Sequence, residues 1–238
     1  MAARTSLLQT LKLRFPRLRW ALRKVFGGNP PKGDIYYGDM AALYDAERTD
    51  SKRWRREQAA VEAFLDRLPR DLSVLDVPVG TGRYLPLYQA RGHRATGFDA
   101  SHEMLAETRK RAEALGVELP LDQGDATKLP YDDGQFDLVV STRFLRHVLP
   151  FELARVSLAE MARVTRGHAI IEMGLSTRET VWPAEGKPMR DGLNLRDLTA
   201  MFQNAGFEVV DEITTNKQGK RARREGRRRA VFLLRKRG

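Results

Sequence analysis

Short apolar runs alternate with longer, partly polar segments through most of this 238-residue chain. Short apolar runs bounded by polar or glycine-rich turns are typical of strands, and capped amphipathic segments are typical of helices. Ser101 and Asn194 have the positions of N-caps, which predicts helices at about 103–115 and up to Asn204, just before Gly206. An alternation of this kind is typical of α/β proteins. The predicted strands lie at 74–76, 95–98, 117–121, 135–141, 207–214 and 230–235, with a further strand that ends before Gly174.

The segment from Val74 to Arg83 joins a strand end to a glycine-rich turn. The apolar run closes on the carboxylate of Asp76, and the chain then passes through Gly80 and Gly82 into a helix-like segment. Glycines let the backbone approach a ligand closely, and free N–H groups at a helix N-terminus point toward it. This segment therefore predicts a nucleotide-binding turn at the carboxyl end of the first strand.

Two further carboxylates follow predicted strands. Asp99 lies seventeen residues after Gly82, at the tip of the second strand. A carboxylate in that position can accept hydrogen bonds from the two hydroxyls of a ribose. Asp125 follows the third predicted strand and can accept a hydrogen bond from an adenine amino group. The spacing of the three acidic strand ends therefore favours a nucleoside ligand.

The order and spacing of these motifs resemble those of the class I S-adenosylmethionine-dependent methyltransferases. The resemblance extends over roughly residues 36–210 and depends on four motifs. It implies a Rossmann-like doubly wound α/β sheet of seven strands, with helices on both faces and an antiparallel last strand inserted beside the preceding ones. The matching motifs are Leu75-Asp76…Gly80-Thr81-Gly82, Gly97-Phe98-Asp99-Ala100-Ser101…Met104-Leu105, Gly124-Asp125-Ala126…Leu129-Pro130 and Phe136-Asp137-Leu138-Val139.

By this resemblance, S-adenosylmethionine is the expected cofactor. Asp99 is expected to hold its ribose and Asp125 its adenine, while Gly80 and Gly82 contact the methionine end. The expected cofactor-binding residues are Asp76, Pro78, Gly80, Gly82, Arg83, Asp99, Ala100, Met104, Asp125, Ala126 and Ser141.

The glycine-rich loop departs from the usual family pattern at Pro78, where glycine is common. Proline removes a backbone N–H and restricts φ. Family members with a Pro-Cys-Gly-Thr-Gly-Arg loop exist, and this loop resembles that variant with Val79 in place of cysteine. The alternative is a phosphate-binding Rossmann domain for NAD. The loop lacks the G-x-G-x-x-G pattern of such domains, which counts against that interpretation.

The residue types present exclude several kinds of chemistry. The chain has no cysteine, which excludes disulfides, thiolate–metal sites and cysteine nucleophiles. No apolar run reaches the roughly 18 residues that a membrane-spanning helix needs. The histidines lack the spacing of metal ligands, so the sequence predicts no metal site. They are His93, His102, His147 and His168.

The net charge of +11 is unevenly distributed. Residues 1–33 carry eight Lys and Arg and no acid, and residues 215–238 carry eleven Lys and Arg and one acid. The intervening residues 34–214 therefore carry a net charge of −7. We interpret 1–33 as a basic N-terminal extension and 34–238 as the methyltransferase domain. The positive charge of the two termini then serves either to bind a partner of the termini or to keep the protein soluble.

The N-terminal extension has a basic amphipathic pattern. Apolar residues recur at steps of three or four between Ser6 and Phe26, six Lys and Arg fill much of the rest, and Pro16 interrupts the pattern. Three interpretations remain open: a peripheral anchor on an anionic membrane, a helix docked on the domain or a partner, and a cleaved mitochondrial presequence. The expected location is cytoplasmic, with membrane-peripheral and mitochondrial locations as the corresponding alternatives.

The predicted loop between the last two strands, 215–229, carries eight Lys and Arg. It is either a solvated loop or a clamp for the phosphates of nucleic acid or lipid headgroups. No aromatic residue interleaves with these charges, so the base stacking used by single-strand binders is not provided.

Candidate catalytic residues lie where α/β sheets bind ligands, beyond the carboxyl ends of the strands. His147 follows the fourth strand, and the ordinary pKa of histidine suits a general base; the alternative is a local hydrogen bond at the start of the next helix. Arg143 and Arg146 are candidates either to hold an anionic substrate group or to pair with surface acids. Tyr44 lies in a lead-in that resembles the family's lid and is the second catalytic candidate. Trp182, in a turn-rich insertion, either walls the substrate pocket or lies in an ordinary surface loop.

The segment after the fourth strand also bears on the acceptor. It lacks the Asn/Asp-Pro-Pro-Tyr/Phe motif of enzymes that methylate amino groups in nucleic acids, and its Leu145-Arg146-His147-Val148 resembles small-molecule methyltransferases. The sequence therefore predicts methyl transfer from S-adenosylmethionine to a small molecule, and an amphipathic or membrane-associated acceptor is one option within that class. The alternatives are an RNA or ribosome methyltransferase recruited by the basic tails, with nucleic acid not favoured, and a non-catalytic cofactor-binding partner. The oligomeric state is not indicated.

Overall fold

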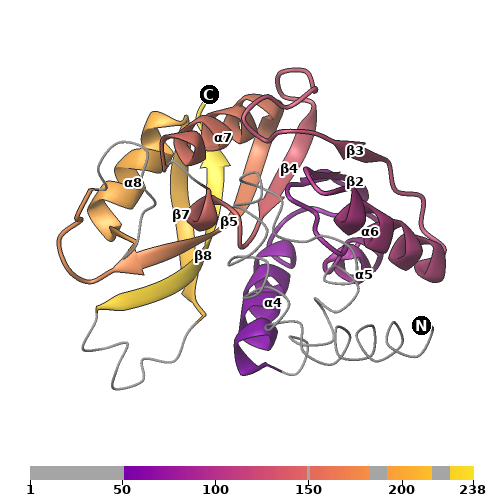
Figure 1. Cartoon of the computed structure of the whole chain (residues 1–238), viewed down its shortest axis with the longest axis horizontal. Helices are drawn as coiled ribbons and strands as arrows, with labels where there is room; N and C mark the ends of the chain where they lie inside the picture. Colours follow the sequence, from indigo (N-terminus) through magenta and orange to yellow (C-terminus); the bar gives the residue numbers. More distant parts are fainter. Residues whose placement is uncertain (1–50, 149–150, 183–191, 216–225) are drawn as a thin grey trace, which may run out of the picture.

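The sheet is mostly parallel and runs across the whole molecule (Figure 1). The computed structural model describes residues 51–148, 151–182, 192–215 and 226–238. The strand order is β3-β2-β1-β4-β5-β8-β7, with the short β6 paired to the end of β5. The strands are β1 (Ser73–Asp76), β2 (Arg94–Asp99), β3 (Leu121–Gln123), β4 (Phe136–Ser141), β5 (Thr165–Ser176), β6 (Leu193–Asn194), β7 (Phe207–Thr214) and β8 (Arg227–Lys236).

Helices cover both faces of this sheet. In Figure 1, α7 and α8 lie above the sheet and α4 lies below it. The buried residues form two clusters, one under α7 and α8 and the other under α4, α5 and α6. Along β4, Val139 belongs to the first cluster while Leu138 and Val140 belong to the second, which is the two-residue period of a strand buried on both faces. The helices are α4 (Lys52–Leu65), α5 (Leu85–Gln89), α6 (His102–Leu115), η1 (a 3-10 turn, Leu145–His147), α7 (Phe151–Val164) and α8 (Leu195–Asn204).

Capping side chains start the helices where the sequence predicts them. The Ser101 hydroxyl accepts a hydrogen bond from Met104 N at 3.3 Å, and the Asn194 side chain accepts one from Asp197 N at 2.8 Å. Each bond satisfies a backbone N–H that has no partner within its helix. The predicted caps of α6 and α8 are therefore confirmed.

The antiparallel end of the sheet also agrees with the expectation. β8 is antiparallel to both β5 and β7 and lies between them, so the last strand is inserted beside strands that precede it in the chain. The predicted seven strands become eight because two residues, Leu193 and Asn194, add β6 at the end of β5.

The third strand lies later in the chain than predicted. The apolar residues of 117–121 suggested a strand there, but pairing with β2 begins at Leu121 and continues to Gln123. Val117 and Leu119 instead pack against the cluster under α4, α5 and α6. These two residues are therefore apolar because they pack against the core from the segment that connects α6 to β3, and they do not belong to a strand.

Several predictions lie outside the described residues: the extension 1–33, its boundary at residue 34, Tyr44, and most of the basic loop 215–229. Within the described ranges, none of the helices has the length and apolar character needed to span a bilayer.

Candidate functional site

A tight turn follows β1 and carries two glycines with positive φ. Gly80 has φ +59° and Gly82 has φ +71°, a region that side chains disfavour. A Cβ on Gly82 would lie 2.9 Å from Leu85 Cδ1, whereas a Cβ on Gly80 would meet nothing within 4 Å. Gly82 therefore satisfies a packing requirement, while Gly80 lies beside open space at the carboxyl end of the sheet.

Asp99 ties this turn to the tip of β2. Its two carboxylate oxygens accept hydrogen bonds from Gly80 N and Ser101 N, each at 2.9 Å. Burial raises the pKa of Asp99, and the backbone N–H groups act in the opposite direction. A carboxylate can accept about four hydrogen bonds, more than these backbone N–H groups use, so Asp99 can still accept one from a ligand.

The carboxyl group of Asp76, at the end of β1, is fully enclosed. It accepts a hydrogen bond from the Tyr88 hydroxyl at 3.0 Å. Burial, with a smaller contribution from Asp99, raises the pKa of Asp76 to about 8, although the Tyr88 hydrogen bond and Arg83 oppose the shift. Asp76 is therefore mainly protonated at neutral pH and can donate a hydrogen bond.

The structure brings most of the expected cofactor residues to one edge of the sheet. β2, β1 and β4 are parallel neighbours, so Asp99, Asp76 and Ser141 end adjacent strands. The Ser141 hydroxyl is buried and has no hydrogen-bond partner in the described part of the chain. Other expected cofactor-binding residues lie around this edge. Pro78 is half-buried, Met104 on α6 and Ala126 are buried, and Ala100 and Asp125 are exposed after β2 and β3. Asp125 there accepts a hydrogen bond from Thr127 N at 2.8 Å.

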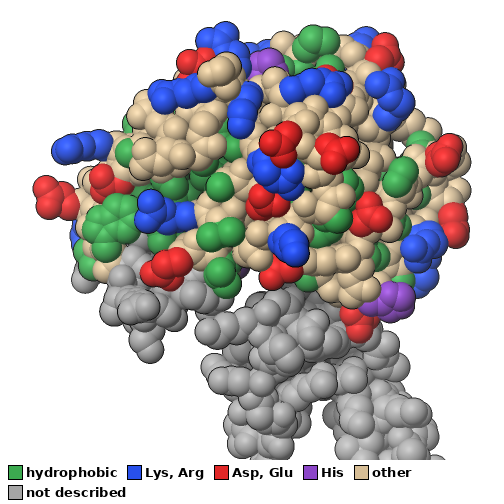
Figure 2. All heavy atoms as spheres, turned by 90° about the horizontal axis from the view of Figure 1, so that it is seen from above, with side chains coloured by type: hydrophobic (Ala, Val, Ile, Leu, Met, Phe, Trp, Pro, Cys, Tyr) green, Lys and Arg blue, Asp and Glu red, His purple; other side chains and the backbone are tan. Residues whose placement is uncertain are grey.

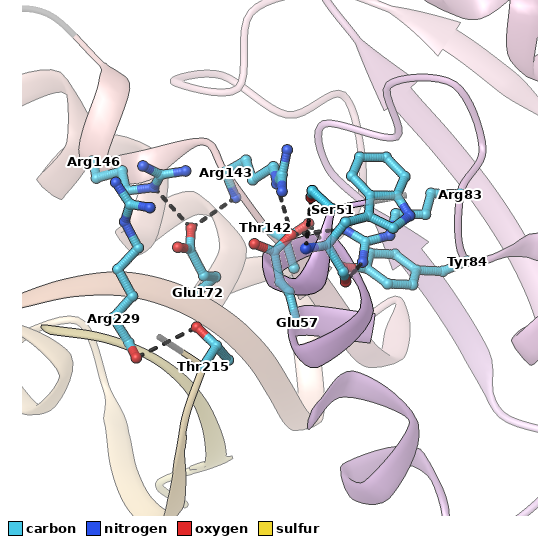
Figure 3. Close-up of polar contacts among 11 residues, drawn as sticks. Ser51, Glu57, Arg83, Tyr84, Thr142, Arg143, Arg146, Glu172, Thr215 and Arg229 are labelled. Carbon is cyan, nitrogen blue, oxygen red and sulfur yellow. Dashed lines mark hydrogen bonds and ion pairs between the residues drawn. The ribbon is translucent and has the colours of Figure 1, made fainter. Parts of the chain in front are cut away.

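Beside the turn lies a cluster of arginines and glutamates that only the fold assembles (Figure 3). Glu57 of α4 is completely buried, and its Oε1 pairs with both Arg83 and Arg143 at 2.7 Å. Glu172 of β5 is also completely buried, and its Oε2 accepts from Arg143 N at 3.1 Å and from Arg146 Nε at 2.9 Å. Two buried carboxylates thus hold three arginines in an alternating row.

An indole ring supports the same arginines. The Arg83 guanidinium lies 3.7 Å from the centre of the Trp54 ring and also donates to the Trp54 carbonyl oxygen. The Arg143 guanidinium lies 4.8 Å from the same ring. Arg143 has φ +58°, a backbone conformation that costs energy in a residue with a side chain. The geometry of the segment after β4 is therefore imposed by its surroundings.

His147 lies in η1, next to this positive charge. Desolvation by the surrounding protein, followed by Arg146, Arg229, Arg53 and Arg143, lowers the pKa of His147 to about 4. The imidazole is therefore neutral at pH 7, and it is a weaker base than an ordinary histidine.

Tyr44, the second catalytic candidate, lies outside the described residues. Trp182 is exposed, with its ring centre 6.4 Å from that of Phe151.

Glu57 and Glu172 are site residues that the sequence analysis missed. Glu172 did carry a signal, because it follows Ile170 and Ile171 in an apolar run, and a charge at such a position is rarely buried without a partner. Glu57 carried none, since it lies on a polar helix that precedes every recognised motif.

Comparison with known proteins agrees with this geometry. A family model described as "Methyltransferase domain" matches residues 74–168. The chain is 45% identical over 130 residues to phosphatidylethanolamine N-methyltransferase of Cereibacter sphaeroides, covering 52% of this chain and 59% of that protein. It is 37% identical over 114 residues to demethylmenaquinone methyltransferase of Thermus thermophilus, covering 47% and 49%. The match thus spans about half the length of these curated relatives.

Solved structures share the fold at lower identity. The 1,6-didemethyltoxoflavin-N1-methyltransferase of Burkholderia thailandensis, solved with S-adenosylhomocysteine, superimposes with a TM-score of 0.60 at 21% identity, covering 84% of this chain and 86% of that one. The cyclase SpnF superimposes with a TM-score of 0.64 at 20% identity, covering 96% of each chain. The chain thus shares the Rossmann-like fold of these structures. The family match assigns residues 74–168 to a region similar to the methyltransferase domain.

Proposed function

We propose that this chain transfers a methyl group from S-adenosylmethionine to a small-molecule acceptor. The observation that carries the proposal is the turn after β1, where Asp99 is tied to Gly80 at the carboxyl edge of a parallel sheet. In sheets of this type ligands bind at that edge. Methyltransferase relatives with named small-molecule acceptors support the proposal.

The residues present fit the proposed cofactor. Asp99 has lone pairs left for the ribose hydroxyls, Gly80 leaves open space beside its backbone, and Ser141 offers a buried hydroxyl with no partner in the described ranges. Asp125, at the exposed end of β3, would accept from the adenine amino group. When bound, S-adenosylmethionine supplies a methyl group already activated on a positively charged sulfur.

The chain's own contribution is then mainly alignment. Transfer of an activated methyl group requires the acceptor atom in line with the bond that breaks, and holding two reactants in one geometry removes much of the entropic cost. The paired Arg83, Arg143 and Arg146 give the neighbouring surface a fixed shape, because two buried glutamates hold them. The neutral His147 is available as a hydrogen-bonding group there.

Calorimetric titration with S-adenosylmethionine tests the cofactor assignment directly. Asp99→Asn keeps the size of the side chain and removes its charge, so the affinity should fall about tenfold or more through loss of charge-assisted hydrogen bonds. Glu113→Gln, at an exposed position of α6, is the matched control and should bind like the wild type. Unchanged affinity in Asp99→Asn would refute the assignment.

A methyl-transfer assay tests the reaction and the acceptor class. Cell extract incubated with radiolabelled S-adenosylmethionine and the protein, then separated into lipid, small-metabolite, RNA and protein fractions, should carry label in the lipid or small-metabolite fraction. Label in RNA would support recruitment by the basic tails instead. Cofactor binding without label in any fraction would indicate a non-catalytic partner protein.

We also propose that the acceptor is presented at a membrane. The support is the basic amphipathic pattern of residues 1–28, where each Lys or Arg near an anionic surface contributes about 1 kcal/mol at most. Full-length protein should sediment with anionic liposomes in a salt-sensitive way, and deletion of residues 1–28 should abolish this without changing cofactor affinity. Sedimentation of the truncated protein would assign binding to residues 215–229, and no sedimentation of the full chain would exclude membrane presentation.

A further inference from the structure

Asp76 ends β1 directly before the nucleotide-binding turn, and its carboxyl group is almost completely buried. The residue is 2% exposed, although it lies at the carboxyl edge of the sheet. Its neighbours across the two adjacent strands are Gly97 of β2 and Val140 of β4, which bring no charge. An ionised carboxylate in such surroundings is costly unless a cation or several hydrogen bonds compensate its charge.

The compensation that Asp76 receives from the chain is small. Tyr88 of α5, which is 1% exposed, donates its hydroxyl hydrogen to Asp76 Oδ2 at 3.0 Å. Arg83 also acts on the charge of Asp76, but its guanidinium pairs with Glu57. In the part of the chain that the structure describes, no ion pair involves Asp76. A single hydroxyl group is therefore its direct polar partner there.

The ionisable groups that act on Asp76 come from each element packed against it. Asp99 ends β2, Arg83 lies in the turn, and Tyr84 and Tyr88 belong to the start and the body of α5. Burial is the largest influence and raises the pKa of Asp76 to about 8, with Asp99 acting in the same direction and Tyr88 and Arg83 against it. The enclosed carboxyl group therefore holds a proton at pH 7.

Other carboxyl groups of the chain are placed differently. Figure 2 shows acidic side chains interspersed with Lys and Arg over the face seen from above, where water and nearby cations compensate them. Asp99 is buried like Asp76, but it accepts hydrogen bonds from Gly80 N and Ser101 N, each at 2.9 Å. Asp76 has neither a backbone donor nor a paired cation among the described residues.

The position of Asp76 exposes it to the charge of the expected ligand. S-adenosylmethionine has positive charge on its sulfur and on its amino group. Asp76 opens the turn in which Gly80 leaves open space beside its backbone, at the sheet edge where ligands bind. A positive charge near a carboxyl group favours the ionised form of that group. A cationic ligand at this edge therefore favours loss of the proton from Asp76.

We propose that Asp76 balances the positive charge of the bound methyl donor by releasing its proton, and that Tyr88 is a positioning residue for the carboxylate that forms. The proposal rests on the proposed function and adds how the site compensates the charge of the donor. The O–H bond of the Asp76 carboxyl group breaks, its electron pair stays on the carboxylate, and the proton passes to the buffer. One positive charge enters the site and one leaves, so the total charge of the buried site is conserved.

Tyr88 is suited to this role in both protonation states of Asp76. Burial, followed by the charge of Asp76, raises the pKa of Tyr88 well above its ordinary value, so the phenol keeps its hydrogen. Its hydroxyl already donates to Oδ2, and a hydrogen bond to an ionised acceptor is stronger than one to a neutral acceptor. The carboxylate therefore gains a stronger hydrogen bond without a rearrangement of α5.

Calorimetry measures proton release apart from catalysis. The full chain is titrated with S-adenosylmethionine at about pH 7 in phosphate, PIPES and Tris buffers, whose enthalpies of ionisation differ. The dependence of the observed enthalpy on the buffer should correspond to release of about one proton in the wild type. Asp76→Asn, which has no proton to release, should show no such dependence. Glu113→Gln, exposed on α6, is the matched control and should behave like the wild type.

The same release makes the affinity depend on pH. Since a proton must leave for the donor to bind, the dissociation constant of the wild type should fall about tenfold per pH unit between about pH 6 and 7.5, below the pKa of Asp76. Asp76→Asn should lack this slope. Release of equal size with S-adenosylhomocysteine would assign the effect to the amino group that both ligands carry, and release with S-adenosylmethionine alone would assign it to the charged sulfur.

Tyr88→Phe tests the positioning role. Loss of the hydroxyl should weaken S-adenosylmethionine binding about tenfold, because the carboxylate loses its hydrogen bond. In the Asp76→Asn background the same change should cost less than about threefold, since no carboxylate remains to be held. Tyr131→Phe, which removes a hydroxyl that donates to the exposed Asp122 at 2.9 Å, is the matched control and should bind like the wild type.

The outcomes separate this proposal from the proposed function. Binding of S-adenosylmethionine without proton release, or release that persists in Asp76→Asn, would overturn the role of Asp76 and leave the proposed function intact. An equal cost of Tyr88→Phe with and without the Asp76 carboxyl group would overturn the role of Tyr88. A wild-type chain that does not bind S-adenosylmethionine would overturn the proposed function and this proposal with it.

Discussion

The carboxyl edge of the sheet has two halves that are made of different kinds of chemical groups. Around β1 and β2, the turn at Gly80 and the carboxyl groups of Asp76 and Asp99 are joined by backbone N–H groups and the Tyr88 hydroxyl. Around β4, β5 and β8, arginine side chains are joined by Glu57 and Glu172. The first half presents carboxyl groups to its surroundings, and the second presents guanidinium groups that two buried carboxylates hold in place. The two halves therefore differ in the chemical groups that they present along one sheet edge.

The largest expected effect concerns the charged half. Glu57→Ala should lower the free energy of unfolding by about 3–5 kcal/mol, because Arg83 and Arg143 would lose the carboxylate that neutralises them in a buried position. Urea denaturation followed by circular dichroism measures this effect. Glu113→Ala, exposed on α6, should change the stability by less than about 0.5 kcal/mol. A loss of similar size in both variants would show that the pairs at Glu57 contribute no more than a surface position.

An effect that is smaller for each pH unit, but accumulates over the pH range, is expected in the half that contains Asp76. The pKa of Asp76 is about 8 in the folded chain and 3.8 in the free side chain, so the folded state retains a proton that the unfolded state releases between these values. The contribution of Asp76 to stability should therefore fall as pH rises through this window, by about 1.4 kcal/mol per pH unit, and level off above pH 8.

Asp76→Asn isolates this contribution, since the amide still accepts from Tyr88 and does not ionise. Denaturation midpoints measured from pH 5 to 9 should show the variant gaining stability relative to the wild type as pH rises toward about 8. Parallel curves for the two proteins would mean that Asp76 is ionised in the folded chain, contrary to its raised pKa.

The smallest expected effect concerns His147. With a pKa of about 4, its imidazole does not titrate between about pH 5.5 and 8, so methyl transfer should show no inflection from this residue in that range. His147→Gln, which keeps a neutral hydrogen-bonding side chain, should reduce the rate less than about tenfold, whereas loss of a general base costs about a hundredfold or more. A pH–rate profile of both proteins distinguishes the two roles, and a hundredfold loss of rate together with a lost inflection would identify His147 as a general base.

Local patterns in the sequence accounted for the half around β1 and β2. The strand ends at Asp76 and Asp99, the glycine turn and the cap at Ser101 each depend on residues close together in the chain, so spacing alone located them. The limits of β3 were wrong because Val117 and Leu119 are apolar for packing and not for pairing, and an apolar run does not distinguish the two. The capped start of α8 and the final hairpin were also predictable from local signals.

The sequence by itself determined which family this chain resembles, that two of its strands end at Asp76 and Asp99, and that its charge is unevenly distributed. Only the tertiary structure decided that Arg53, Arg143, Arg146 and Arg229 meet around Glu57 and Glu172. The physical reason is that these residues come from α4, the segment after β4, β5 and β8, which are elements far apart in the sequence. Their approach depends on the register of β5 against β8 and on the packing of α4 beneath the sheet, which are properties of the assembled fold.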